Sequence, residues 1–169
     1  MTKKRLACWA AGVAGTAATL TGVALATPGA GAVGTMMARA GFAPSVDVVF
    51  KVKDDGNDGT DVIHVRNAQD TVVQQITFNP GGHTGWHSHP GPALVLVTQG
   101  ELTLYSADDP TCSGRTYSAG QAFIDRGQGH VHIGRASQTQ NTVVWVTYFD
   151  VLPGSGVRTD EADPGTCVF

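Results

Sequence analysis

Short runs of apolar residues, several of them alternating with polar ones, follow one another along most of the chain and predict β-strands. Two of these runs, Leu94–Val97 and Val143–Val146, are apolar at every position, which is typical of strands covered on both faces. Turns that contain Gly or Pro, such as Asn79–Gly82 and Gln99–Gly100, separate neighbouring runs. No segment shows a convincing helical period. We predict strands over residues 46–52, 62–66, 72–78, 93–98, 101–105, 115–117, 122–124, 130–135 and 143–149.

This pattern predicts an all-β fold, an antiparallel double-sheet jelly roll, because many short strands joined by tight turns close most readily into a sandwich or barrel. Only 15% of the 169 residues are charged and 22 are glycine, a composition that suits strands and turns better than helices. The length allows one domain with appendages. The formal net charge of −3 argues against nucleic acid as a partner, because it offers no basic face.

The N-terminal segment has a different composition from the rest of the chain. Lys3–Arg5 is positively charged, and Leu6–Ala26 is an uncharged stretch of mostly small and apolar residues. This arrangement predicts a secretory signal peptide within residues 1–32, cleaved after Ala26 or Ala32, and therefore a secreted protein without stable membrane association. The alternative is an uncleaved membrane anchor, because about 20 apolar residues can span a bilayer. We expect residues 33–45 to form a flexible leader and residues 46–169 to form the domain.

Removal of a signal peptide leaves two cysteines, Cys112 and Cys167. An even number of cysteines in an exported chain favours a disulfide, and two free thiols are the alternative. The bridge would close a loop of about 55 residues, which is worth roughly 4 kcal/mol in the chain-entropy model.

Four of the six histidines form two pairs of the type His-x-His, His87 with His89 and His130 with His132. Side chains two residues apart on a strand point to the same face. Paired imidazoles on one buried face are the beginning of a metal site, because imidazole binds several divalent transition metals. A polar network around water is the alternative for buried imidazoles, which need a hydrogen-bond partner if no metal is bound.

The spacing of these pairs and of the glycines around them resembles the two sequence motifs of the cupin superfamily. The first motif matches at Gly81, His87, His89 and Gly100, and the second follows the outline of Gly120–His130. The resemblance covers about residues 71–150. It implies a cupin-type β-barrel with a metal in its interior, a small-molecule ligand or substrate, and a homodimer formed through edge strands.

Two departures from the motifs change the expected site. Ala93 occupies the position of the usual glutamate ligand, and Asp125 or Arg126 occupies that of a proline. A three-histidine metal site, or a site that has lost its metal, therefore remains. The spacing from Gly120 favours His130 as the third ligand, with His132 as an alternative or additional one. The metal would be Fe, Mn, Ni, Cu or Zn, which the residues do not distinguish.

Three functions are compatible with this sequence. The first is a metal-dependent oxygenase or isomerase of a small organic molecule, because three imidazoles leave coordination positions open. The second is a non-catalytic module that binds a small molecule, and the third is a structural exported domain. Whether the chain is an enzyme stays open, because this fold supports many unrelated activities.

Overall fold

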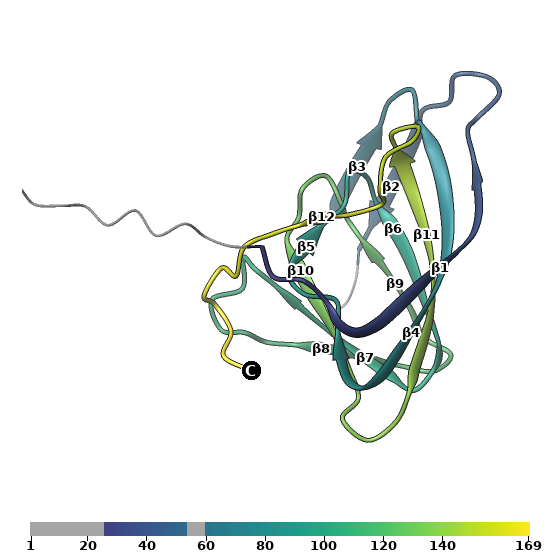
Figure 1. The fold of residues 1–169 in the computed structure, drawn as a ribbon. Helices are drawn as coiled ribbons and strands as arrows, with labels where there is room; N and C mark the ends of the chain where they lie inside the picture. The colour runs from purple at the N-terminus through teal and green to yellow at the C-terminus, as the bar shows by residue number, and fades with distance from the viewer. Residues whose placement is uncertain (1–25, 54–59) are drawn as a thin grey trace, which may run out of the picture.

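The computed structural model describes residues 26–53 and 60–169, which form twelve strands and no helix (Figure 1). Most of the predicted signal peptide, residues 1–25, lies outside the described residues. Within the described ranges, no helix has the length and hydrophobicity needed to cross a bilayer. The strands are β1 (Ala30–Ala40), β2 (Val48–Val52), β3 (Asp61–Val65), β4 (Asp70–His83), β5 (His87–Ser88), β6 (Ala93–Gln99), β7 (Glu101–Ser106), β8 (Arg115–Ser118), β9 (Ala122–Asp125), β10 (His132–Ala136), β11 (Thr142–Val151) and β12 (Thr159–Asp160).

One strongly curved sheet contains ten of these strands and encloses the interior of the domain. Its order is β12-β5-β10-β4-β11-β6-β9, with β1 on β4 and with β7 and then β8 beyond β10. Every pairing is antiparallel, so the all-β antiparallel prediction is confirmed. The two far edges approach each other, because Tyr117 of β8 stacks on Phe123 of β9 with ring centroids 4.3 Å apart. The hairpin β2–β3 is a separate two-stranded sheet.

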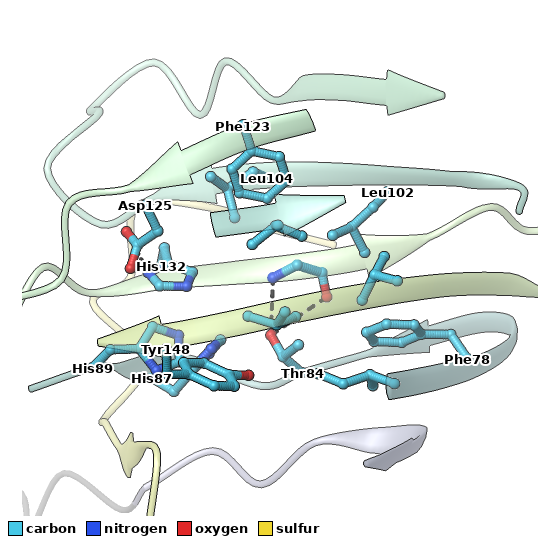
Figure 2. A pocket seen from close by; sticks show the side chains of 15 residues that line it. Phe78, Thr84, His87, His89, Leu102, Leu104, Phe123, Asp125, His132 and Tyr148 are labelled. Carbon is cyan, nitrogen blue, oxygen red and sulfur yellow. Dashed lines mark hydrogen bonds and ion pairs between the residues drawn. The ribbon is translucent and has the colours of Figure 1, made fainter. Parts of the chain in front are cut away.

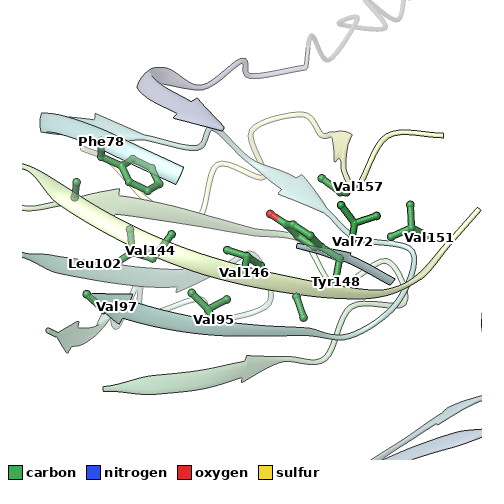
Figure 3. Packing of buried hydrophobic residues seen from close by; sticks show 12 residues of the cluster. Val72, Phe78, Val95, Val97, Leu102, Val144, Val146, Tyr148, Val151 and Val157 are labelled. Atoms are coloured by element: carbon green, nitrogen blue, oxygen red, sulfur yellow. The ribbon is translucent and has the colours of Figure 1, made fainter. Parts of the chain in front are cut away.

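The hydrophobic core fills the interior of this sheet, and β11 shows why it forms (Figure 3). Its side chains alternate along the strand, so Val144, Val146 and Tyr148 are buried while Val143 and Trp145 are partly exposed. The inward residues meet Val95 and Val97 of β6 in the same cluster. The sequence predicts a strand covered on both faces here, but Val143 and Trp145 are partly exposed, because alternate side chains face opposite sides and only one side lines the core.

Residues 30–40 form strand β1, although the sequence predicts a flexible leader from residue 33 onwards. β1 pairs antiparallel with β4, from Ala30 opposite His83 to Ala40 opposite Thr71. Most of its side chains are exposed, so it has no alternation of buried and exposed positions that the sequence could reveal. The stabilising contacts are backbone hydrogen bonds to a distant strand, which depend little on side-chain pattern.

The ends of the domain are attached by specific contacts. Arg39 in β1 forms an ion pair with Asp70 at 2.6 Å and also donates to the carbonyl oxygens of Leu152 and Ser155. Cys112 and Cys167 are joined in a disulfide, as the sequence predicts. The disulfide brings the C-terminal residues against the buried side chains of Trp86 and Ile133, which form a second small core.

Candidate metal centre

Three histidines from two neighbouring strands converge at one end of the interior. His87 in β5 and His132 in β10 are direct cross-strand partners, and His89 follows immediately after β5. Their ring centroids are between 4.4 and 5.2 Å apart, and one nitrogen from each ring lies within 4.8 Å of the others. All three residues are buried, with between 4% and 6% of their surface exposed. Figure 2 shows them gathered at one end of the pocket, with Phe78 and Leu102 at the other.

Each of these rings is held through its Nδ1 atom by a backbone carbonyl. His87 contacts the oxygen of Gly85 at 2.9 Å, His89 that of Val157 at 2.8 Å, and His132 that of His130 at 3.3 Å. A carbonyl oxygen can only accept, so Nδ1 carries the hydrogen in each ring and Nε2 keeps its lone pair. A metal requires this form of the ring, and a hydrogen bond at the second nitrogen is the usual way to orient a histidine ligand.

The electrostatic surroundings also favour the neutral form of all three rings. Burial lowers the pKa of His87 far below its ordinary value, and the rings of His132 and His89 lower it further. Burial lowers the pKa of His132 to about 4, although the Asp125 carboxylate acts in the opposite direction. Burial likewise lowers the pKa of His89 against the effects of Asp125 and the Val157 carbonyl. The triad therefore consists of neutral imidazoles at ordinary pH.

The structure does not bring His130, the third ligand favoured by the sequence spacing, into this group; it places the alternative, His132, there. A regular strand over 130–135 would direct both rings to one face, but β10 begins only at His132. The preceding residues form a turn, with positive φ at Gln128 and Gly129 and a hydrogen bond from the amide of His130 to the carbonyl of Gly127. His64, exposed in β3, and His83 at the end of β4 also lie outside the triad.

His130 belongs instead to a chain of side-chain contacts that runs from the surface toward the triad. Its Nε2 lies 2.6 Å from Ser106 Oγ, and its Nδ1 lies 3.0 Å from Asp125 Oδ1. The same carboxylate oxygen is 3.5 Å from Nδ1 of His132. The order serine, histidine, aspartate matches that of a hydrolytic triad. Here, however, the Ser106 hydroxyl donates to Asp108 at 2.5 Å, so its hydrogen is not directed at His130. We interpret this series of side-chain contacts as a network that orients His132.

Comparison with known families agrees with this geometry. A family model described as "Cupin domain" matches residues 74–147, which contain all three histidines of the triad. This match identifies residues 74–147 as a cupin domain. None of the curated proteins compared with the sequence matches it.

Several solved structures resemble part of this cupin chain. A cupin-like protein from Thermotoga maritima has 25% identity and a TM-score of 0.44 over 55% of this chain and 65% of its own. An oxalate oxidase has 22% identity and a TM-score of 0.41 over 47% and 41%, respectively. The polyketide cyclase RemF from Streptomyces resistomycificus has 20% identity and a TM-score of 0.44 over 56% and 64%. The chain thus covers less than two thirds of each of these proteins.

The carboxylate nearest the cupin triad comes from a position that the sequence motif does not assign to a ligand. Ala93, at the glutamate position, is buried in β6 and pairs across the sheet with Asp125 in β9. Asp125 is buried and faces the histidines. Burial would raise the pKa of its carboxyl group, but His132 and the hydrogen bond from His130 outweigh burial and lower that pKa. Asp125 is therefore an anion beside the triad. The sequence places Asp125 at or next to the proline position of the second motif and by itself assigns it no role there.

Proposed function

We propose that the chain is an exported cupin that binds a divalent transition metal through His87, His89 and His132 and acts on a small organic molecule at that metal. The arrangement of the three rings carries this proposal, because each has its Nδ1 engaged by a carbonyl and its Nε2 available. Neutral imidazoles suit Fe, Mn, Ni, Cu and Zn. A metal held by three protein ligands would supply Lewis-acid or redox chemistry at its open positions.

The residues around the triad provide a small, mostly apolar chamber. The interior cavity has a volume of about 40 Å³, which admits only a few atoms beside the histidines. Its walls combine apolar side chains, including Phe78, Leu102 and Val146, with the polar groups of Thr84 and Tyr148. Burial raises the pKa of Tyr148, so its phenol keeps its hydrogen and can donate to a bound molecule. The chain would thus exclude water and orient the reacting end of a small ligand.

Metal analysis and turnover test the proposal together. The protein should be purified without chelators and without a histidine tag, and its metal content should be measured per chain. Oxygen uptake and product formation should then be followed with a panel of small organic molecules. One metal ion per chain together with turnover supports the enzyme, provided that the His87→Ala, His89→Ala double variant loses both. Wild-type protein that takes up no divalent transition metal contradicts it.

A non-catalytic binding module is the second candidate, and Ala93 is the observation that favours it. This buried methyl group leaves the first motif without its usual carboxylate ligand, and Asp125 is held by hydrogen bonds to His130 and Gly127. Saturable binding of a small molecule to metal-loaded protein without any turnover would favour the module over the enzyme.

Thr27 supports export with cleavage after Ala26. Its amide donates to the carbonyl of Glu161 at 2.9 Å, and its hydroxyl oxygen accepts from the amide of Trp86 at 2.9 Å. Cleavage after Ala32 would remove both contacts and the first three residues of β1. Cleavage after Ala26 keeps them, because the mature chain then begins at Thr27. We therefore favour Ala26 of the two predicted sites.

A further inference from the structure

An outer cavity of about 450 Å³ adjoins the histidine triad. It lies between β1, the middle strands β4 and β11, and the C-terminal segment 156–160. His87, Thr84, Ile76 and Tyr148 line both this cavity and the interior one, so the outer cavity leads to the triad. Its volume is within the range of sites for small organic ligands.

Arg158 is the only Lys or Arg among the residues that line the outer cavity. It also lines a third cavity, of about 460 Å³, which reaches His89 from the other side of the segment 156–159. The guanidinium group is positioned by protein contacts, since it donates to the carbonyl oxygen of Thr84 at 2.9 Å and to the carboxylate of Asp160. These contacts occupy two of its five N–H donors, so others remain for a ligand.

The charge of Arg158 also reaches the triad. Arg158 and His87 line the same outer cavity, and the Arg158 guanidinium donates to the carbonyl oxygen of Thr84, which lines both cavities. One small molecule in the outer cavity can therefore contact both Arg158 and the triad.

Apolar side chains also line the outer cavity, together with the polar side chain of Gln74. Met36 and Ala32 of β1 face the cavity from one side, Ile76 of β4 from the second and Val157 from the third. The cavity thus combines a cation near the triad with an apolar wall. Arginine binds planar carboxylates well, because its paired N–H groups match the two carboxylate oxygens.

We propose that the outer cavity binds a small organic acid, with its carboxylate on Arg158 and its apolar body against Met36 and Ile76. The binding of the acid depends only on the cavity. The placement of the end of the acid farther from Arg158 toward a metal at His87 rests on the proposed function. Asp160 competes with the ligand for the guanidinium group, so its negative charge weakens the site.

Hexanoate and the uncharged hexanamide are suitable probes, because they share an apolar chain and differ in charge. Their binding to ¹⁵N-labelled protein should be followed by NMR through the amides of Gly34, Val157 and Arg158. Hexanoate should bind the wild type more tightly than hexanamide. Arg158→Gln should weaken the binding of hexanoate by about tenfold or more, the loss expected for hydrogen bonds to a charged group. It should change the affinity for hexanamide by less than about twofold.

Two variants complete the test. Asp160→Asn should strengthen hexanoate binding, because it removes the competing carboxylate. Arg66→Gln removes a charge from an exposed residue that lines none of these cavities, and it should leave both probes unchanged. Equal affinity for the two probes, equal weakening of both by Arg158→Gln, or no saturable shift with hexanoate would overturn the proposal.

The same titrations with chelator-treated and metal-loaded protein separate this inference from the proposed function. Hexanoate that binds chelator-treated protein through Arg158 supports the acid site even if the histidines hold no metal. The opposite result is metal bound at the triad together with equal hexanoate affinity in Arg158→Gln and the wild type. That result overturns the acid site alone.

Discussion

His87 and His132 are direct cross-strand partners, and their ring centroids lie 4.4 Å apart. They are separated by about one quarter of the sequence, but β5 and β10 bring them into one pair. This pairing, and not the His-x-His spacing at residues 130–132, determines which histidine completes the triad. The first prediction tests this assignment directly.

His132→Ala should lose most of the bound metal, and His130→Ala should retain it. Only His132 has a nitrogen close to both His87 and His89, whereas His130 is turned toward Ser106. His87→Ala and His89→Ala should each resemble His132→Ala, and His64→Ala serves as the control because His64 is exposed in β3. Metal content per chain is the measurement. Loss of metal in His130→Ala with full retention in His132→Ala would reverse the assignment.

Asp125→Asn should weaken metal binding by roughly 10- to 100-fold without removing a ligand of the triad, the usual effect of losing a group that orients histidine ligands. The carboxylate contacts His130 and lies 3.5 Å from Nδ1 of His132, so its loss changes the orientation and basicity of that ring. Competition with a metal indicator dye measures the affinity. Asp108→Asn, at an exposed carboxylate farther along the chain of contacts, should have a smaller effect. Equal effects of the two substitutions would argue against a special role for Asp125.

The metal-free protein should lose stability as the pH falls from about 6.5 to about 4. His132 has an ordinary pKa of 6.5 that burial lowers to about 4 in the folded state, so the unfolded chain binds its proton first. The contribution of neutral His132 to the free energy of unfolding is fully present above the pKa of the unfolded state. It is lost as the pH falls toward and through the pKa of the folded state. The size of this contribution is on the order of 3 kcal/mol.

Urea unfolding of chelator-treated protein across this pH range measures the effect. His132→Gln should reduce the pH dependence of the free energy of unfolding, because it removes one of the three buried imidazoles whose pKa is lowered in the folded state. His64→Gln should leave the slope unchanged. A slope that His132→Gln does not alter would show that other groups cause the acid sensitivity.

Cys167→Ser should lower the melting temperature and loosen the C-terminal residues while the metal stays bound. The disulfide closes a loop of 55 residues, which is worth about 4 kcal/mol in the chain-entropy model. Phe169, two residues further on, packs against Tyr105 with ring centroids 4.9 Å apart, and this contact should become mobile. Calorimetry and proteolysis of the C-terminus report the change. Metal loss in the variant would mean that the tail supports the triad through Trp86 and Ile133, the chain neighbours of His87 and His132.

Secreted protein should begin at Thr27. Cleavage there preserves the hydrogen bonds of Thr27 to Glu161 and Trp86 and the whole of β1. N-terminal sequencing identifies the site, and a start at Val33 would show that the domain tolerates loss of this end of the strand. An intact Met1 on a membrane-bound product would instead support an uncleaved anchor. Thr27→Val, which removes the hydroxyl but keeps the shape, should lower the melting temperature of the mature protein modestly.

Local pattern along the sequence determined much of this cupin domain. The short, mostly apolar run 143–149 predicts β11, because such a run between turns is typical of a buried strand. The spacing of His87 and His89 likewise places two imidazoles together, and the count of cysteines in an exported chain predicts the bond between Cys112 and Cys167. These features depend on near neighbours or on composition, which the sequence displays directly.

Contacts between distant segments decided the rest. β1 forms because the edge of β4 offers backbone partners to Ala30–Ala40, a segment whose own side chains show no strand pattern. His132 replaces His130 because a turn with positive φ at Gln128 delays the start of β10. Arg158 reaches the cavity beside His87 only because the C-terminal segment returns across the domain. Such pairings depend on where the backbone closes in space, and one-dimensional spacing carries no information about that closure.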